Sequence, residues 1–515
     1  MARINTNISS VIAQQNLSRT QGELQTRLER LSTGLRINRG ADDPAGLIIS
    51  ERIRSDVSGV NQGIKNSERA RSVIATTEAS LNEINELLLS IKSLIVESAN
   101  TGGQSEDERR ANQLQIDSAI DSITRISNTA SFGGLRLLNG SLDYRLSGMP
   151  SSAISLAQVT NASFVGNASL SVQVDVIASA QRGALYYNGG TTPAGVTLSA
   201  LTLELAGSRG VQVITVPSGQ SLATLRDSVN NLTALTGVRA RLINNNANSG
   251  IVFETIDYGS NSFVSVRRLQ GPSTGDSFTL RKFDNNAALS NPAPFNWADV
   301  NLVQATRDTG ADVSALVNGN LATGDGLSLS INSGALSAKL LLTEAAAIRP
   351  AATAQAFSIT GGGALFQLGQ DVTALQQTNI GIQSVAASNL GGVVNSSGIV
   401  EFLTTLKSGQ SNSLATSVSR NDFTSANDIL DKAIDDVTIL RGRLGAFEKN
   451  VLDTNVRSLQ SAFENLTASN SQIRDADFAA ETSLLTRSQI LSSSGTAILG
   501  LANQTSQQVL QLLQG

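Results

Sequence analysis

Residues 488–515 read SQILSSSGTAILGLANQTSQQVLQLLQG, and this stretch at the end of the chain contains no Asp, Glu, Lys or Arg. Its apolar side chains recur at spacings that place them on one face of a helix. They are Ile490, Leu491, Ala497, Ile498, Leu501, Val509, Leu512 and Leu513. Ordering a residue costs roughly 1–2 kcal/mol, and burying one such side chain returns roughly 1.5–3 kcal/mol. The stretch therefore needs packing partners.

The beginning of the chain offers the first partner. Its apolar residues repeat at intervals of three and four, as in a coiled-coil-like helix. They are Ile4, Ile8, Val11, Ile12, Leu24, Leu28, Leu31 and Leu35. Two such helices leave apolar surface exposed, which favours packing against neighbouring copies of the same chain. Self-assembly is the leading hypothesis, and an ordinary helical bundle within one chain is the alternative.

Composition excludes several functions. The 515 residues include neither Cys nor His, which excludes disulfides, thiol catalysis, His-dependent triads and zinc sites with Cys or His ligands. A net charge of -4 gives no general attraction to nucleic acid or anionic membranes. No apolar run approaches the length of a membrane span, and the first residues lack the apolar core of a secretory signal peptide. We expect no cofactor, no metal site, no nucleic-acid partner and no membrane span.

Two regions near the chain ends are typical of long helices. Asp43 and Pro44 form an N-cap followed by proline at the first helical position, which predicts a helix over residues 44–99. Ser105 and Glu108 form a capping-box pattern that opens a second helix, and glycines 133 and 134 end it. The heptad positions of the first helix are Ile53, Val57, Val60, Ile64, Leu81, Ile84, Leu88, Ile91 and Ile95. Helical periodicity returns near residue 426 and includes Leu444, Val451 and Leu466.

Asn139 and Gly140 form the dipeptide that a two-residue turn favours, so residues 135–146 are predicted to be a hairpin.

Two consecutive carboxylates, Asp42 and Asp43, could suggest a metal site. The better interpretation is that Asp42 and Asp43 belong to a loop and a helix N-cap, because no third metal ligand lies nearby in the sequence.

The middle of the chain differs in kind from the ends. Short alternating runs broken by Gly, Asn, Ser and Asp predict β-rich surface domains over residues 168–400. Residues 198–266 follow the order strand, strand, helix, strand, strand, which predicts a small α+β module. The fold class is α+β multidomain, with long N- and C-terminal helices in a coiled-coil-like stalk and β-rich domains inserted between them. Both termini then lie at one end.

The predicted domains are defined by these patterns. Residues 1–43 and 469–515 form a terminal helical domain, and residues 44–167 and 401–468 form a second helical domain with the hairpin. Residues 168–400 form the surface domains.

These residues resemble the bacterial flagellins. Near the N-terminus the resemblance rests on residues 4–7 (INTN), 16–17 (NL), 30–38 (RLSTGLRIN) and 42–47 (DDPAGL). Near the C-terminus it rests on residues 443–446 (RLGA), 464–466 (ENL), 473–477 (IRDAD), 489–491 (QIL) and 502–504 (ANQ). The resemblance implies a self-assembling subunit of the extracellular flagellar filament. The terminal helices would form its inner tube and the heptad helices the next tube.

The same resemblance implies partners and a route of export. The partners are other copies of the chain, the flagellar cap and hook-associated proteins, and an export chaperone that holds the C-terminal helix. Export would use the flagellar type III apparatus, without a cleaved signal peptide.

Two departures from the family bear on function. Flagellins that the vertebrate Toll-like receptor detects carry an arginine and a glutamate where this chain has Ser90 and Ser93, so receptor recognition is not carried over. Ser506 stands where many flagellins have proline, which predicts an unbroken last helix.

Three alternatives stay open at this point. A hook–filament junction protein shares the Ser-x-Gly-x-Arg and Asp-Asp-Pro elements, although residues 4–7 and 502–504 favour flagellin. An adhesin could use Trp297, Tyr186 and Tyr187 as contacts in the central region. An enzyme is disfavoured because Asp and Glu are sparse in that region.

Overall fold

The computed structural model describes residues 7–164, 169–189, 195–270, 278–284, 295–348, 354–395 and 398–514, and the side chains as far as residue 505 and at residue 508. The chain forms two compact units. We call Met1–Ala70, Gln367–Gln377 and Lys449–Gly515 the terminal unit, and Arg71–Phe366 and Thr378–Glu448 the main unit.

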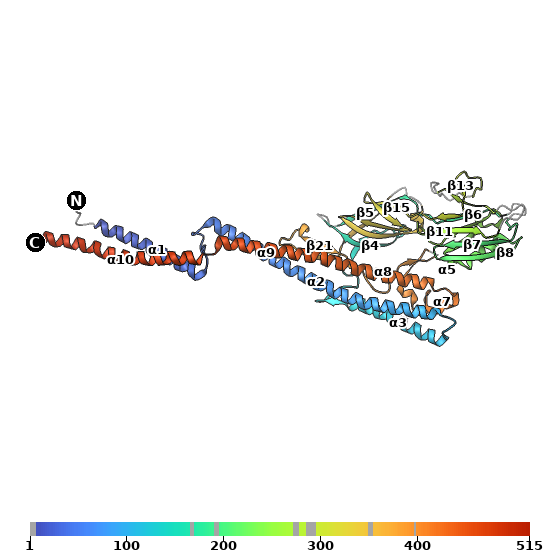
Figure 1. Cartoon of the computed structure of the whole chain (residues 1–515), viewed down its shortest axis with the longest axis horizontal. Coiled ribbons are helices and arrows are strands. Elements are labelled where there is room, and N and C mark those ends of the chain that lie inside the picture. Colours follow the sequence, from blue (N-terminus) through green and yellow to red (C-terminus); the bar gives the residue numbers. More distant parts are fainter. Residues whose placement is uncertain are drawn as a thin grey trace. The chain divides into compact units, whose positions relative to one another are not determined.

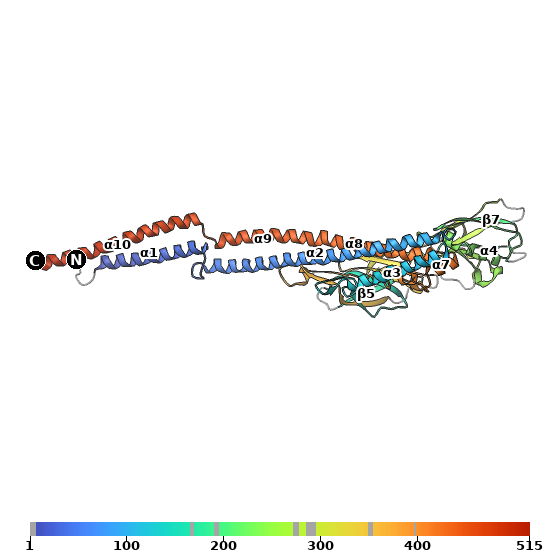
Figure 2. The same ribbon diagram turned by 90° about the horizontal axis from the view of Figure 1, so that it is seen from below.

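The terminal unit pairs the two ends of the chain. Helix α1 (Ile8–Thr33) lies along helix α10 (Phe478–Gln514), and the start of α1 lies toward the end of α10 in both views (Figure 1, Figure 2). Asn7 caps α1 by accepting a hydrogen bond from the backbone N–H of Ser10, and Gly34 ends it in the left-handed conformation, with φ 73°. Helix α10 passes Ser506 without a break, as the sequence predicts.

Helix α2 (Pro44–Ala99) begins and ends where the sequence predicts. The Asp43 side chain accepts a hydrogen bond from the Gly46 backbone N–H at 2.9 Å, which confirms the predicted N-cap. The first part of α2 runs beside α9 (Asp453–Arg474), where Asn455 Nδ2 donates to Ser67 Oγ at 3.1 Å. Heptad patterning thus brings segments together that are far apart in the sequence.

The main unit contains a helical part. Helix α3 (Glu106–Thr129) starts with the predicted capping box between Ser105 and Glu108. Helix α8 (Thr424–Phe447) continues through a π-helical turn (Glu448–Leu452) into α9. Helices α2, α3 and α8 each carry fully buried apolar side chains. They include Ile84, Leu88, Ile91, Ile116, Ile120, Ile123, Leu430, Val437 and Leu444.

The predicted hairpin around Asn139 and Gly140 is wrong. The two-residue turn lies earlier, at glycines 133 and 134 with φ 58° and 86°, and joins β1 (Ser131–Phe132) to β2 (Leu135–Arg136). Two consecutive residues with positive φ are what such a turn requires, and glycine adopts them without strain. Strand β3 (Tyr144–Ser147) pairs instead with β19 (Gln355–Gly362), far along the chain.

The larger β domain of the main unit is an eight-stranded antiparallel sheet in the order β3-β19-β5-β15-β16-β17-β18-β4. Alternate residues of these strands point into one buried core, which includes Ile154, Val172 and Leu340. The further strands are β4 (Ile154–Ala162), β5 (Leu170–Ala178), β15 (Ser314–Val317), β16 (Asn320–Asp325), β17 (Ser328–Asn332) and β18 (Leu336–Leu342).

The second β domain includes residues 198–266, where the order is strand, strand, two helices and three strands, so the structure has one helix and one strand more than the predicted order. Its two sheets have the orders β13-β12-β6-β10-β9 and β14-β11-β7-β8 around one apolar core. The strands are β6 (Ala184–Tyr187), β7 (Leu201–Gly207), β8 (Gly210–Val216), β9 (Val238–Leu242), β10 (Ile251–Thr255), β11 (Phe263–Arg268), β12 (Leu280–Phe283), β13 (Leu302–Gln304) and β14 (Arg307–Thr309). The helices are α4 (Leu222–Asn230) and α5 (Thr233–Thr236).

Short elements complete the chain. They are α6 (Glu344–Ala347), α7 (Leu414–Arg420), β20 (Ala364–Gln367), β21 (Gln377–Ile380), β22 (Val393–Val394) and β23 (Val400–Glu401). Among the helices within the described residues, none combines the length and apolar character needed to cross a bilayer.

Candidate assembly surface

The paired helices α1 and α10 expose a large apolar face. Ile8, Val11 and Ile12 on α1 are each more than half exposed, and Ala13 is the buried residue of that helix. Ile490, Ile498 and Leu501 on α10 are 58–63% exposed. Full burial of such a side chain returns roughly 1.5–3 kcal/mol, and each of these forgoes about half of that, so another surface that covers this face would stabilise it.

The predicted assembly residues lie in three environments. Those exposed on the helix pair also include Leu28 and Leu491. Half-buried residues are Leu24, Leu31, Leu35, Ile53, Val57, Ile64, Val451 and Leu466. Leu88, Ile91, Ile95 and Leu444 are buried in the core of the main unit. Ile4 and the side chains of Val509, Leu512 and Leu513 lie outside the described residues.

An ion cluster joins α1 to α10. The Glu481 carboxylate accepts hydrogen bonds from Arg27 Nη1 at 2.9 and 3.0 Å and from Arg30 Nη1 at 3.2 Å. Its side chain is only 9% exposed. A nearly buried carboxylate is tolerated when cations compensate its charge, and the geometry of the two guanidinium groups fixes how the helices align.

Polar contacts near the chain ends fix the same alignment. Asn7 Nδ2 donates to the Ala502 carbonyl oxygen at 2.9 Å, and Ser10 Oγ donates to Asn503 Oδ1 at 2.8 Å. Between these contacts and the ion cluster, a Cβ at Gly495 would come within 3.2 Å of Leu17 Cδ1, so the helices approach closely there. The helix pair is therefore held in one register along its length.

A short β-bridge holds the two helix breaks together. Arg36 N–H donates to the Arg474 carbonyl oxygen at 2.7 Å, and Ala476 N–H donates to the Gly34 carbonyl oxygen at 2.9 Å. Leu35 and Asp475 are the paired residues of this antiparallel bridge. The break between α1 and α2 thus lies directly beside the break between α9 and α10.

The linker before α2 is held by Asp42. Its carboxylate accepts hydrogen bonds from the backbone N–H groups of Asn38 and Arg39 at 3.0 and 2.8 Å. The hydrogen bond from Arg39, followed by that from Asn38, lowers the pKa of Asp42. These bonds give Asp42 a structural role in the loop.

The ion cluster and the β-bridge were not predicted from the sequence. A signal for the cluster exists, because Glu481 and Arg487 are the only charged residues of α10. A lone carboxylate near the start of an otherwise apolar and polar helix indicates a cationic partner. No comparable signal identifies Leu35 and Asp475 as neighbours, since both lie in irregular backbone.

The main unit also exposes apolar side chains on its helices. Leu89 and Val96 on α2 are 45% and 61% exposed, and Leu114 on α3 is 63% exposed. Ser90 and Ser93 lie on the exposed side of α2 near them. Of the central residues considered as contacts, Tyr187 is buried in a β-domain core, whereas Tyr186 and Trp297 are half-buried.

Comparisons with known proteins agree with this arrangement. Residues 4–143 match the family model of the bacterial flagellin N-terminal helical region, and residues 427–513 match that of the C-terminal helical region. The chain is 30% identical over 533 residues to a flagellin of Escherichia coli K12 and 29% identical over 510 residues to the B-type flagellin of Pseudomonas aeruginosa PAO1. Each match covers 99% of both proteins.

Among solved structures, FlgL of Xanthomonas campestris is similar over 81% of this chain and 98% of its own, with 11% identity and a TM-score of 0.26.

Proposed function

Because the chain belongs to the bacterial flagellin family and is a structural subunit of the extracellular flagellar filament, we propose that its α1–α10 pair is the element that assembles the filament core. The observation that carries the proposal is the exposed apolar face of this pair, which includes Ile12, Ile498 and Leu501. Neighbouring copies would cover that face and supply the missing burial energy.

The absence of charge after Arg487 supports this role. Neighbouring copies bring the same segment close together in a helical assembly, and like charges packed at short range would repel one another. An uncharged segment with Gln, Asn, Ser and Thr between its apolar residues avoids that repulsion. The half-buried heptad residues of α2 and α9 would line the contacts of the next layer.

The proposal extends to partners. The flagellar cap and hook-associated proteins would contact the assembled subunits, and an export chaperone would cover α10 before assembly. The same exposed face supports the chaperone contact, since an uncovered apolar helix in the cell promotes aggregation. Recognition by the Toll-like receptor is not part of the proposal, because Ser90 and Ser93 occupy exposed positions where recognised flagellins carry charged residues.

Export would proceed through the flagellar type III apparatus without a cleaved signal peptide. The lack of cysteine supports this route, since an unfolded chain then refolds outside the cell with no disulfide to form. Amino-terminal sequencing of subunits from purified filaments tests the proposal. We expect the sequence to begin at Met1 or Ala2, and a start tens of residues later would contradict it.

No catalytic role is proposed. The chain lacks the Cys and His side chains that many nucleophilic and metal-dependent mechanisms need. The full-length matches to flagellins favour a filament subunit over a hook–filament junction protein.

Seeded polymerisation, imaged by negative-stain electron microscopy, tests the assembly role. The full chain should extend filament seeds, and a variant that ends before Ser488 should not. Circular dichroism of the truncated variant serves as the control, because the main unit should keep its structure. Extension of seeds by the truncated variant would contradict the proposal.

A further inference from the structure

The second β domain borders a cavity of about 310 Å³ that we call the outer cavity. Its lining combines aromatic rings with guanidinium groups and carboxylates. The aromatic residues are Tyr186, Phe283, Phe295 and Tyr258, and the charged residues are Arg182, Arg239, Arg241, Glu254 and Glu344. A concave surface with apolar rings and a few placed polar groups is the usual form of a small-molecule site.

The aromatic part is an ordered wall. The rings of Tyr186 and Phe295 stack with centroids 4.9 Å apart, and Phe283 meets both of them edge-on, at 5.3 and 5.9 Å. All three side chains are half-buried, so part of each remains accessible. Such rings offer flat apolar faces to the C–H groups of a sugar ring.

The charged part has more cations than anions. Glu254 accepts a hydrogen bond from Arg239 Nε at 2.7 Å, whereas its nearest approaches to Arg182 and Arg241 are 3.9 and 3.8 Å. Three guanidinium groups therefore share this carboxylate, and one other carboxylate, Glu344, lines the described part of the cavity. An additional anion would balance the charge of the lining.

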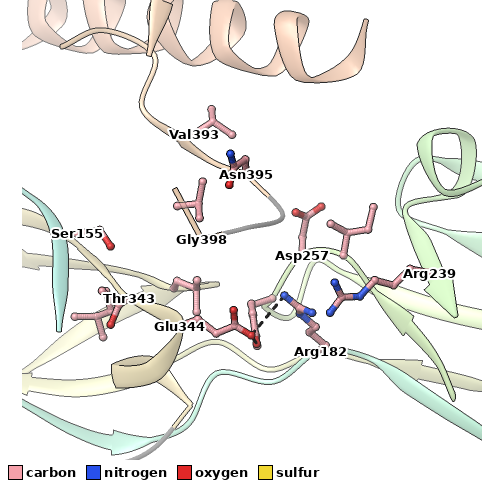
Figure 3. A pocket seen from close by; sticks show the side chains of 14 residues that line it. Ser155, Arg182, Arg239, Asp257, Thr343, Glu344, Val393, Asn395 and Gly398 are labelled. Atoms are coloured by element: carbon pink, nitrogen blue, oxygen red, sulfur yellow. Dashed lines mark hydrogen bonds and ion pairs between the residues drawn. The ribbon is translucent and has the colours of Figure 1, made fainter. Parts of the chain in front are cut away.

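Arg182 has unused hydrogen-bonding capacity. Its guanidinium lies 4.3 Å above the Tyr258 ring, and its closest carboxylate, Glu344, is 3.7 Å away. Its Nε is buried and has no hydrogen-bond partner among the described residues. A neighbouring cavity of about 260 Å³ shares this wall, and Figure 3 shows the guanidinium groups of Arg182 and Arg239 pointing toward one another. Two facing guanidinium groups suit a carboxylate ligand.

Tyr186 can donate a hydrogen bond in the same place. Burial, and next the nearby Glu254 carboxylate, raise the pKa of Tyr186 to about 12, so its hydroxyl stays protonated at neutral pH. The side chain of Asn244 also lines the cavity and offers an amide to a sugar hydroxyl.

We propose that the outer cavity binds an acidic saccharide, with a sugar ring against the Tyr186–Phe295 stack and its carboxylate held by the guanidinium groups that line the cavity, those of Arg182, Arg239 and Arg241. This role goes beyond filament assembly, because it would let the surface domains hold acidic polysaccharides. The cavity volume lies at the lower end of the range for small-molecule sites, which suits a short segment of such a polymer.

The fluorescence of Trp297 can report ligand binding. It is the only tryptophan of the chain, and its ring meets Phe295 edge-on at 5.0 Å. Its fluorescence in the full chain would be followed during titration with digalacturonate, with the neutral disaccharide galactobiose, and with acetate. Calorimetry would repeat each titration independently of fluorescence. We expect saturable binding of digalacturonate, and binding at least tenfold weaker for the other two probes.

Arg241→Gln is the decisive variant. The Arg241 side chain is 57% exposed, so the substitution removes a cation and leaves the core intact. It should weaken digalacturonate binding about tenfold, the effect of one hydrogen bond to a charged group. Arg267→Gln is the matched control, because Arg267 is 64% exposed and pairs with Glu204 away from the cavity lining.

Four results would overturn the proposal. Acetate that binds as tightly as digalacturonate would indicate a simple anion site, and equal binding of galactobiose would remove the role of the carboxylate. Equal effects of Arg241→Gln and Arg267→Gln would place the ligand elsewhere. No binding of digalacturonate by either method would exclude the site. None of these results affects the assembly proposal.

Discussion

Glu481 accepts two hydrogen bonds from Arg27, a residue 454 positions earlier in the sequence, at 2.9 and 3.0 Å. This contact joins the first helix of the chain to the last. It places a compensated charge at one end of a helix pair that also exposes apolar side chains, among them Ile12 and Ile498. We therefore expect pairing within the subunit and assembly between subunits to use different chemistry.

Glu481→Gln should weaken the helix pair. The substitution keeps the side-chain shape but removes the charge that Arg27 and Arg30 share, at an expected cost of about 2 kcal/mol per subunit. Filaments of this variant should dissociate at a lower temperature when heated, followed by light scattering. Glu29→Gln is the matched control, because Glu29 pairs with the exposed Arg39 and should cost less than about 1 kcal/mol. Equal effects of the two substitutions would contradict the role assigned to Glu481.

Gly34→Ala should also destabilise filaments. Gly34 has φ 73°, a left-handed conformation that costs a residue with a Cβ about 1 kcal/mol or more. Gly22→Ala is its counterpart, since Gly22 lies inside α1 with no atom within 4 Å of an added Cβ. That substitution should stabilise α1 by about 0.5–1 kcal/mol. When filaments are heated, Gly34→Ala should therefore lower the temperature at which they dissociate, and Gly22→Ala should raise it. Shifts of the same sign would contradict the role assigned to Gly34 at the end of α1.

Asp312 should make the stability of the main unit depend on pH. Burial acts to raise the pKa of Asp312, but hydrogen bonds from the side chain and backbone of Ser260 and the backbone of Gly326 outweigh it and lower the pKa below 3.8. A carboxyl whose folded pKa is depressed contributes stability above its unfolded pKa and loses it as the pH falls through the folded value. Urea unfolding should therefore show a loss of stability below about pH 3.8.

The Asp312→Asn variant should unfold at lower urea concentration at pH 7 and show a smaller loss of stability in acid. Asp325→Asn removes the same charge from an exposed position on the eight-stranded sheet and should leave the Asp312 contribution intact. If the Asp312→Asn variant lost as much stability in acid as the unsubstituted chain, Asp312 would not be the group that makes the stability depend on pH.

The helical ends could be predicted from the sequence because their signals are local. The Asp43–Pro44 cap and the Ser105–Glu108 capping box fix where α2 and α3 begin, and the heptad spacing fixes which face is buried. The bridge between Leu35 and Asp475 could not be predicted, since nothing local specifies which distant strand a short extended segment will join.

The hairpin predicted around Asn139 was wrong for the same reason. Its side chain accepts a hydrogen bond from the Ser141 backbone N–H at 3.0 Å, so the favoured turn dipeptide forms only a local turn. Buried Leu137 and Leu138 hold the preceding segment in the core, and β3 finds its partner in β19. Arg182 and Arg239, which line both cavities, face each other only because the segment before β6 and the distant strand β9 place them there (Figure 3).

We propose that the apolar face of the α1–α10 pair drives assembly. The most direct measurement is the rate of seeded filament growth for Ile498→Gln, compared with Val300→Gln. Both substitutions replace an exposed apolar residue, but Ile498 lies on α10 and Val300, 91% exposed, lies in the central region. We predict that Ile498→Gln slows growth at least tenfold and that Val300→Gln leaves it unchanged. Normal growth of Ile498→Gln filaments would contradict the account.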